Sequence, residues 1–246
     1  MPAPRLLVPS ITAADRLVSL SAADAHHLSR VLRSTVGDEI RVFDGHGREW
    51  LGRLSSISGT AASVEIVHEA TPAPEPHVRL TLAVGLLKGE QMDRVVRDAT
   101  MLGVFAIVPM STTHVAVPPK AWKGSAVIER WRRVAIASAK QCGRAVVPDV
   151  SAVTPFTEVL GSTPDVPKYM CVEPSLSAEG LETVGAGHPR PRAALALIGP
   201  EGGWSAVEVE QARASGATLV SLGPRTLRAD TAPTVVLTAL WSAWGW

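Results

Sequence analysis

The stretch "IGPEGGWS", residues 198–205, places three glycines and a proline around one acidic side chain, directly after the apolar run 193–198. Ser205 and Glu208 stand at the spacing of a capping box, so we expect a helix to begin at Ser205. The stretch is therefore predicted to join the carboxyl end of a strand to a helix. In open α/β sheets ligands bind at this end of the strands, and glycines let a ligand approach the main chain without meeting a side chain.

A second loop of the same kind, "LGPRTLRADTAPT" at residues 222–234, follows the apolar stretch "TLVSL". Gly223 and Pro224 turn the chain, and Arg228 and Asp230 precede the next expected helix. Neither loop matches the glycine and lysine spacings that bind phosphates or dinucleotides. For a single loop of this type, an ordinary tight turn is the better explanation. Two of them after neighbouring strands indicate one shared ligand, and main-chain contacts with some apolar lining favour adenosine or a thioether over a polyphosphate.

Around these loops, apolar strands alternate with helices. This pattern predicts an α/β domain with a mainly parallel sheet. The strands are expected at residues 80–85, 104–109, 168–173, 194–199 and 218–223, and the helices at 90–102, 126–142, 205–215 and after Asp230. The segment "EATPAPEPHV", residues 69–78, resembles an extended linker, and shorter β-rich runs precede it. We therefore expect a small β-rich domain over residues 1–73 and the α/β domain over residues 74–246.

The β-rich part contains one expected helix, over residues 21–33, which opens with the capping pattern of Ser21 and Asp24. Three residues are expected on its apolar face: Leu28, Val31 and Leu32. A basic stripe on another face consists of three residues at helical spacing: His26, Arg30 and Arg33. A stripe of this kind is typical of a solvated helix face, and it also suits contact with phosphates.

The helix expected at residues 90–102 has a continuous apolar stripe and ends at Gly103. Two pairs of opposite charge lie four residues apart along it, Glu90 with Arg94 and Asp93 with Arg97. Packing and these pairs explain the helix, so the sequence assigns none of its charges to chemistry.

Composition excludes some classes of protein. Hydrophobic residues make up 46% of the chain and charged residues 19%, and no apolar run reaches the roughly 18 residues of a membrane span. With no secretory signal pattern at the N-terminus and two cysteines, Cys142 and Cys171, without metal or redox spacing, we expect a cytoplasmic protein. The seven histidines lack ligand spacing, so we expect no metal.

Net charge is +1, but basic residues gather locally. Between residues 120 and 144, Glu129 is accompanied by seven basic residues: Lys120, Lys123, Arg130, Arg132, Arg133, Lys140 and Arg144. Such a patch attracts phosphate, although charge counting alone describes a solvated helix face equally well.

The two glycine-rich loops resemble the paired cofactor loops of the ribosomal RNA small-subunit methyltransferase E family. The resemblance extends over nearly the whole chain in the family's order. It includes "HHLSRVLR" at 26–33, "GDEIRVFDGHG" at 37–47, "KGEQMDRVVRDATMLGV" at 88–104, "RWRRVAIASAKQCGRAVVP" at 130–148 and "VEPS" at 172–175. Two places depart from the family: Thr113-His114 stands where the family often has Glu-Arg, and Asp230-Thr231 where it often has Glu-Thr. The first change removes a positive charge, and the second keeps the carboxylate.

This resemblance implies a SPOUT-class enzyme, in which a PUA-like RNA-binding β-barrel precedes an α/β domain whose C-terminal segment forms a trefoil knot. It implies S-adenosylmethionine as the cofactor, N3 of a uridine in 16S rRNA of the small ribosomal subunit as the methyl acceptor, and a homodimer with no membrane association. The apolar final helix and the tail "WSAWGW" suit either a dimer interface or an internal core. Two other functions stay open: methylation of another RNA atom, such as a ribose 2'-hydroxyl, and non-catalytic binding of rRNA during assembly.

On this basis we assign site residues. The cofactor is expected to contact Ile198, Gly199, Glu201, Gly202, Gly203, Leu222, Gly223, Leu227, Arg228 and Thr231. Arg228 is the first choice for stabilising charge on the base, with an ion pair to Asp230 or Glu201 as its alternative. Glu201 either accepts the N3 proton or braces its loop, and we favour bracing. RNA is expected to contact Arg5, His27, Arg30, Arg33, Lys88, Arg133 and Arg144.

Overall fold

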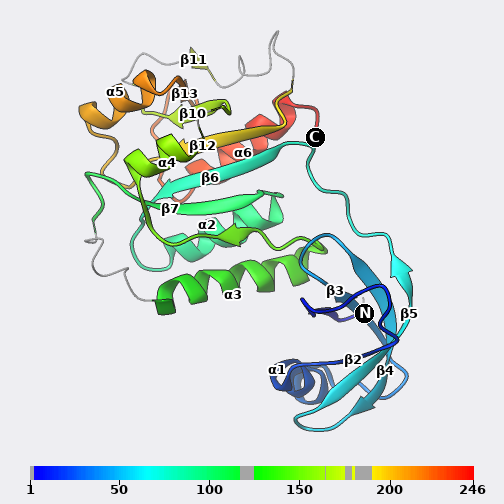
Figure 1. Cartoon of the computed structure of the whole chain (residues 1–246). Coiled ribbons are helices and arrows are strands. Elements are labelled where there is room, and N and C mark those ends of the chain that lie inside the picture. Colours follow the sequence, from blue (N-terminus) through cyan, green and yellow to red (C-terminus); the bar gives the residue numbers. More distant parts are fainter. Residues whose placement is uncertain (1–2, 117–124, 164, 175–178, 181–189) are drawn as a thin grey trace. The chain divides into compact units, whose positions relative to one another are not determined.

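The computed structural model describes residues 3–116, 125–163, 165–174, 179–180 and 190–246. Its contacts divide the chain into two compact units, and we describe each by itself (Figure 1). The first unit comprises Met1–Glu75 and Ala139–Val147, and the second comprises Pro76–Ser138 and Pro148–Trp246. The break after Glu75 lies in the proline-rich segment. The return of residues 139–147 to the first unit is a feature that the single boundary expected from the sequence does not include.

The first unit is built on a five-stranded sheet in the order β1-β3-β4-β5-β2. Its strands are β1 (Arg5–Leu7), β2 (Leu17–Ser19), β3 (Glu39–Phe43), β4 (Glu49–Ile57) and β5 (Ala62–Ala70). β1 pairs with β3 in parallel, and the other pairs are antiparallel. Alternate residues such as Ile40, Val42, Leu54 and Val64 point into one core, as expected for strands with one buried face. The expected β-rich region is confirmed.

The helix expected over residues 21–33 is present, but its geometry changes partway. It begins as α1 (Ala22–His26), whose cap is confirmed: the Ser21 hydroxyl accepts a hydrogen bond from the backbone N–H of Asp24 at 3.1 Å. It continues as the π-helical turn η1 (His27–Leu32) and ends at Arg33, which has a left-handed backbone with φ of 55°.

The π-helical turn changes which side chains face the core. In a π-helix the hydrogen bonds close from residue i to i+5, so successive side chains rotate differently than in an α-helix. Leu28 is buried as expected, but Val31 and Leu32 are 63% and 37% exposed. The assignment of these two residues to the apolar face is therefore wrong. All members of the basic stripe, His26, Arg30 and Arg33, are exposed.

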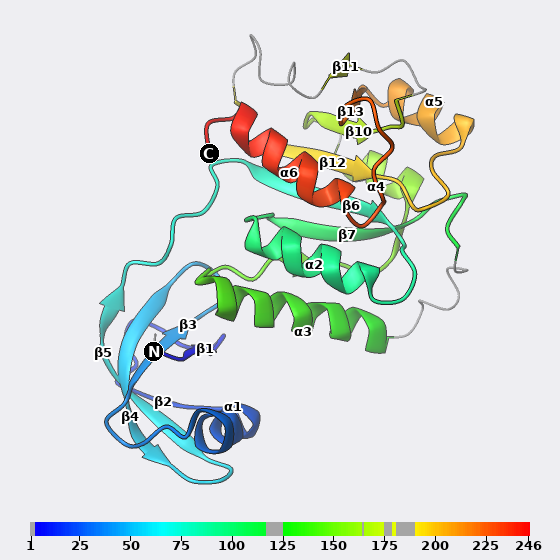
Figure 2. The same cartoon turned by 180° about the vertical axis from the view of Figure 1, so that it is seen from behind.

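The second unit is an α/β sandwich around a parallel sheet, which in the described residues has the order β11-β13-β10-β12-β6-β7-β8, with β9 paired to β7. Its strands are β6 (Arg79–Gly85), β7 (Ala106–Ser111), β8 (Asp149–Val150), β9 (Thr154–Pro155), β10 (Lys168–Cys171), β11 (Glu179–Gly180), β12 (Ala193–Ile198) and β13 (Ala217–Ser221). Its helices are α2 (Gln91–Met101), α3 (Ser125–Cys142), α4 (Phe156–Ser162), α5 (Ala206–Ala214) and α6 (Ala232–Ala243), and the last turn of α3, from Ala139, is counted with the first unit. Figures 1 and 2 show α4 and α5 on one face of this sheet and α2 and α6 on the other. The predicted fold class is confirmed.

The longer strands and helices expected from the sequence are present within about two residues of their expected bounds. The sequence reading missed α4 and the short strands β8, β9 and β11. In α4, Phe156, Val159 and Leu160 are buried. Three apolar positions in seven residues are too few to establish a helical period, and Gly161 near the end weakens the pattern further.

The last strands of the second unit do not follow sequence order along the sheet. β11, which follows β10 in the sequence, pairs with the outer side of β13, and β12 pairs with the side of β10 that faces away from β13. After β13 the chain crosses back to α6, which contacts β12 and α2. The trefoil knot implied by the family resemblance depends on the connection between β10 and β12, most of which lies outside the described residues.

The final helix α6 supplies core to its own unit. Val236 and Leu240 have no exposed surface, and Trp241 is 4% exposed. The indole N–H of Trp241 donates a hydrogen bond to the carbonyl oxygen of Leu102 at 2.7 Å. Of the two explanations offered for this apolar helix, an internal core accounts for these residues.

Candidate functional site

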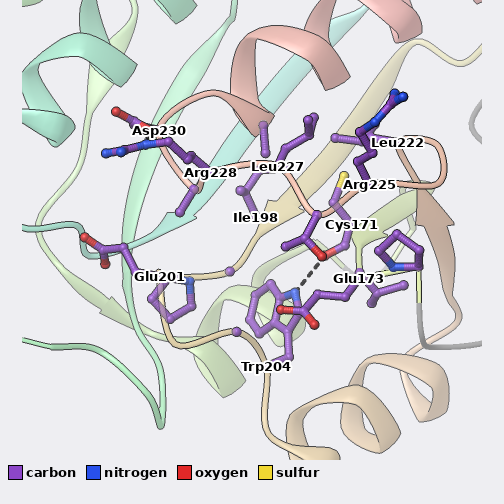
Figure 3. A pocket seen from close by; sticks show the side chains of 18 of the residues that line it. Cys171, Glu173, Ile198, Glu201, Trp204, Leu222, Arg225, Leu227, Arg228 and Asp230 are labelled. Carbon is purple, nitrogen blue, oxygen red and sulfur yellow. Dashed lines mark hydrogen bonds and ion pairs between the residues drawn. The ribbon is translucent and has the colours of Figure 1, made fainter.

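The two glycine-rich loops meet because of the strand order. β10 lies between β12 and β13 in parallel register, with Cys171 opposite both Ile198 and Val220. The carboxyl ends of the three strands therefore lie at one edge of the sheet, and the chain segments that follow them enclose a cavity of about 470 Å³ (Figure 3). Such a volume lies in the range of small-molecule sites, about 300–1,000 Å³.

Most of the residues assigned to the cofactor line this cavity: Ile198, Gly199, Glu201, Gly203, Leu222, Leu227 and Arg228. Gly202, Gly223 and Thr231 lie outside its lining. The cavity also has a wall that the sequence assignment missed, the segment after β10 with Cys171, Val172, Glu173 and Pro174. The motif "VEPS" at residues 172–175 marked this segment in the sequence, but its place beside the two loops depends on strand order.

Two of the glycines make room for the protein itself. A Cβ atom at Gly202 would lie 2.7 Å from the carbonyl oxygen of His114, and one at Gly199 would lie 3.1 Å from the Trp204 ring. Contacts under about 3 Å are closer than carbon atoms tolerate, so Gly202 permits the segment after β7 to pack against the loop. Bare backbone at Gly202, which lies outside the cavity lining, thus serves the support of the loop itself.

Glu208 joins the segment after β7 to the loop after β12. The capping box is confirmed: the Ser205 hydroxyl accepts from Glu208 N, and the Glu208 carboxylate accepts from Ser205 N at 2.9 Å. Its other oxygen accepts from Thr113 N at 2.8 Å. Burial alone would raise the pKa of Glu208, but the hydrogen bonds from Ser205 and Thr113 together hold that pKa below its usual value. The departure from the family at Thr113-His114 therefore contacts the loop after β12 and the first turn of α5.

Trp204 fixes the loop after β12 to the end of β10. Its indole N–H donates to the carbonyl oxygen of Cys171 at 2.8 Å, the bond drawn in Figure 3. Its ring packs on Phe156 of α4, with centroids 5.3 Å apart. Burial raises the pKa of the Cys171 thiol to about 12, so this thiol stays neutral at physiological pH.

Glu201 and Arg228 each have a partner in the protein. One oxygen of Glu201 accepts a hydrogen bond from the backbone N–H of Lys88 at 3.1 Å, which is the kind of contact that bracing the loop requires. The Arg228 guanidinium donates through Nε to Asp230 at 3.1 Å, the ion pair considered as its alternative. Because the Arg228 side chain is still 73% exposed, its remaining N–H groups are accessible to a ligand.

The residues assigned to RNA divide into two groups. His27, Arg30 and Arg33 in the first unit, and Lys88 and Arg133 in the second, are exposed. Arg5 and Arg144 form the second group, because their side chains have little exposed surface. Lys120 and Lys123 of the basic patch lie outside the described residues.

Arg5 and Arg144 hold the first unit together. Arg5 donates to the carbonyl oxygen of Ala139 at 2.8 Å and pairs with Glu49 at 3.0 Å, and its side chain is 11% exposed. Arg144, 6% exposed, pairs with Glu75 through two guanidinium nitrogens at 2.6 and 2.9 Å. Guanidinium groups committed to such contacts are not presented to a phosphate, so we withdraw both from the set assigned to RNA.

The chemistry of the cavity fits S-adenosylmethionine. Its apolar lining includes Ile198, Leu222 and Leu227, against which a nucleoside can pack, and its acidic lining includes Glu173 and Glu201, which suit a cation. The cofactor carries positive charge on both its sulfonium and its amino group. Within the described residues, no cluster of His, Cys, Asp and Glu is placed to hold a metal ion.

No helix in the described part of the chain is both long and apolar enough to span a membrane.

Comparison with known proteins agrees with this geometry. Residues 74–241 match the family model of an RNA methyltransferase domain, and residues 20–67 match that of an RNA methyltransferase PUA domain. Ribosomal RNA small subunit methyltransferase E of Synechocystis is 36% identical over 95% of this chain and 75% of its own length. The protein of that name from Bacillus subtilis is 29% identical over 90% of this chain and 88% of its own. A crystal structure of that enzyme from Neisseria gonorrhoeae bound to S-adenosyl methionine superposes with a TM-score of 0.89 at 30% identity over 98% of both chains. The chain therefore belongs to the ribosomal RNA small subunit methyltransferase E family.

Proposed function

We propose that this protein transfers the methyl group of S-adenosylmethionine to N3 of a uridine in 16S rRNA of the small ribosomal subunit. The observation that carries the proposal is the cavity between the loops after β12 and β13, with its apolar and acidic lining. The solved relative from Neisseria gonorrhoeae was crystallised with the same cofactor, and membership of the family supplies the acceptor.

The cofactor supplies a methyl group on a positively charged sulfur, which is a good leaving group for an in-line displacement. The protein then has mainly to position the acceptor and to exclude alternative geometries. Apolar contacts from Ile198, Leu222 and Leu227 and main-chain groups of both loops serve this positioning.

Uridine N3 carries a proton in the neutral base, so attack requires its loss. Negative charge then spreads onto O2 and O4 of the base, and a donor placed there stabilises it. We assign this role to Arg228, whose exposed guanidinium borders the cavity while Asp230 orients it. Glu201 braces its loop through the N–H of Lys88.

N3 lies on the pairing edge of uridine, so the target base must be unpaired or turned out of its stack. Proteins read such bases by direct contact with the exposed edge while basic residues hold the backbone. For the backbone we propose His27, Arg30 and Arg33 of the first unit together with Lys88 and Arg133 of the second, which are all exposed.

We include in the proposal a homodimer that acts in the cytoplasm, where small subunits are assembled. The outer side of α6 carries small and partly exposed residues, among them Val235, Thr238 and Ala239, while its inner side is buried within the unit. Light scattering on the purified chain should give about twice the mass of 25.9 kDa. A monomer at micromolar concentration contradicts this part of the proposal.

The proposal is tested by measuring N3-methyluridine in 16S rRNA. 16S rRNA from a strain that lacks this gene should contain no N3-methyluridine at the target, and the purified protein with S-adenosylmethionine should restore it, as measured by mass spectrometry of nuclease fragments. A full complement of N3-methyluridine in the deleted strain refutes the proposal. Methyl transfer to a ribose 2'-hydroxyl supports the alternative enzyme. Calorimetry that detects no binding of S-adenosylmethionine supports the non-catalytic assembly protein.

A further inference from the structure

Arg94 of α2 has a partner that the sequence did not indicate. In the described residues Arg94 pairs with Asp230, and Asp93 pairs with Arg130, in place of the pairs along the helix. Nη1 of Arg94 lies 3.6 Å from Oδ2 of Asp230, and Nε of Arg228 lies 3.1 Å from Oδ1 of the same carboxylate. One side chain from α2 thereby joins the loop that borders the cavity.

This arrangement holds two accessible guanidinium groups on one carboxylate that lines the cavity. The Asp230 side chain is 9% exposed, whereas the Arg94 and Arg228 side chains are 56% and 73% exposed. Asp230 thus faces two guanidinium groups, while Glu173, Glu201 and Arg225 also line the cavity. Of the nearby acidic groups, Glu201 borders the same cavity and is braced by the N–H of Lys88. Figure 3 shows Arg228 and Asp230 side by side above Glu201.

Two guanidinium groups that share a buried carboxylate are suited to an anion with several oxygens. Each guanidinium group keeps planar N–H donors that match the geometry of a phosphate. The shared carboxylate orients both side chains beforehand, so less side-chain conformational entropy is lost on binding. Each ribose in an RNA strand has one backbone phosphate on its 5' side and one on its 3' side. A base that approaches the cavity therefore brings backbone phosphates toward the cavity's edge. The carboxylate of the cofactor is the other anion that such a pair would suit.

We propose that Arg94 binds one backbone phosphate next to the target uridine, together with those N–H groups of Arg228 that the base leaves free, and that Asp230 orients both guanidinium groups. The inference rests on the proposed function, because it takes RNA as the substrate. It assigns a substrate contact to Arg94, a residue that the sequence explained by a pair with Glu90 along the helix.

The test compares Arg94→Ala with Arg97→Ala as a matched control. Arg97 lies on the same helix, is 53% exposed and pairs with Asp98 at 2.7 Å, so both variants remove one exposed, paired guanidinium. Binding to 16S rRNA from the deleted strain is measured between about 50 and 200 mM salt. Loss of one phosphate contact should make the slope of log affinity against log salt shallower by about 0.7–0.9 in Arg94→Ala. The affinity deficit of Arg94→Ala should therefore shrink about threefold across this range. Arg97→Ala should keep the wild-type slope, and Arg94→Lys should recover most of it.

Calorimetry with S-adenosylmethionine separates the two anions. We expect Arg94→Ala to bind the cofactor with wild-type affinity. An unchanged salt slope in Arg94→Ala overturns the inference, as does weaker cofactor binding without a change in slope, which would assign the pair to the cofactor carboxylate. Methylation by the wild-type protein reports on the proposed function separately: a wild type that forms N3-methyluridine while Arg94→Ala keeps its salt slope refutes the phosphate pair alone. A wild type that forms none refutes the proposed function, and the inference with it.

Discussion

Replacing Glu208 by glutamine should lower the free energy of unfolding. It should do so only at pH values at which the wild-type side chain is ionised. Glu208 is 5% exposed and accepts hydrogen bonds from Thr113 N at 2.8 Å, from Ser205 N at 2.9 Å and from the Ser205 hydroxyl at 2.8 Å. Glutamine keeps one acceptor oxygen but presents an NH₂ group to donors on the other side.

The magnitude follows from these contacts. A hydrogen bond to an ionised group contributes about 1.5–3 kcal/mol, and part of the total is offset by the cost of burying the carboxylate. We therefore expect Glu208→Gln to lower the free energy of unfolding by about 2 kcal/mol at neutral pH. Glu210→Gln, on the exposed side of the same helix, is the control and should stay within about 0.5 kcal/mol of wild type.

The difference in stability between wild type and Glu208→Gln should depend on pH. The folded-state pKa of Glu208 lies below its ordinary value of 4.5, so the carboxylate contributes stability that is present above that value. This contribution is lost as the pH falls through the folded-state pKa, because a protonated glutamate resembles glutamine. Urea unfolding at several pH values should therefore show a full difference between wild type and Glu208→Gln at pH 7 and a shrinking one below about pH 4.5. A difference that stays constant into acid, or none at pH 7, refutes the reasoning.

Three further predictions concern individual side chains. Iodoacetamide should alkylate exposed Cys142 in the folded protein and leave Cys171 intact, because burial raises the pKa of Cys171 to about 12; peptide mass spectrometry that finds Cys171 modified first would contradict this. Trp204→Phe keeps a ring but loses the hydrogen bond to Cys171 O, and we expect about fivefold weaker cofactor binding by calorimetry, roughly 1 kcal/mol; unchanged affinity would show that this bond does not order the loop. Removing Arg30 and Arg33 together should flatten the salt slope of RNA binding by about 1.4–1.8, and an unchanged slope would exclude them as phosphate contacts.

The sequence predicted most of the fold because its long elements follow clear periods. The apolar strands of the second unit, the caps at Ser21 and Ser205 and the stop at Gly103 depend on neighbouring residues, and the structure contains them. The two loops were identified by the same local logic. The wall formed by Glu173 and Pro174 was missed because its place beside the loops depends on strand order.

Side-chain partners were less accessible to prediction. Arg94 has a carboxylate four residues away along its helix, yet it pairs with Asp230, 136 positions later in the chain. Arg144 belongs to a stretch rich in positive charge, yet it is buried against Glu75. Val31 has the spacing of an α-helical core position, and the π-helical turn exposes it. For the two arginines a residue far away in the sequence decides the partner, and for Val31 the local change to π-helical geometry decides the exposure.

A crystal of this protein grown with S-adenosylmethionine tests the central claim most directly. The account predicts density for the cofactor in the cavity between residues 198–203 and 222–228, with its nucleoside against Ile198, Leu222 and Leu227. Density for the cofactor at any other place, with this cavity empty, would contradict it.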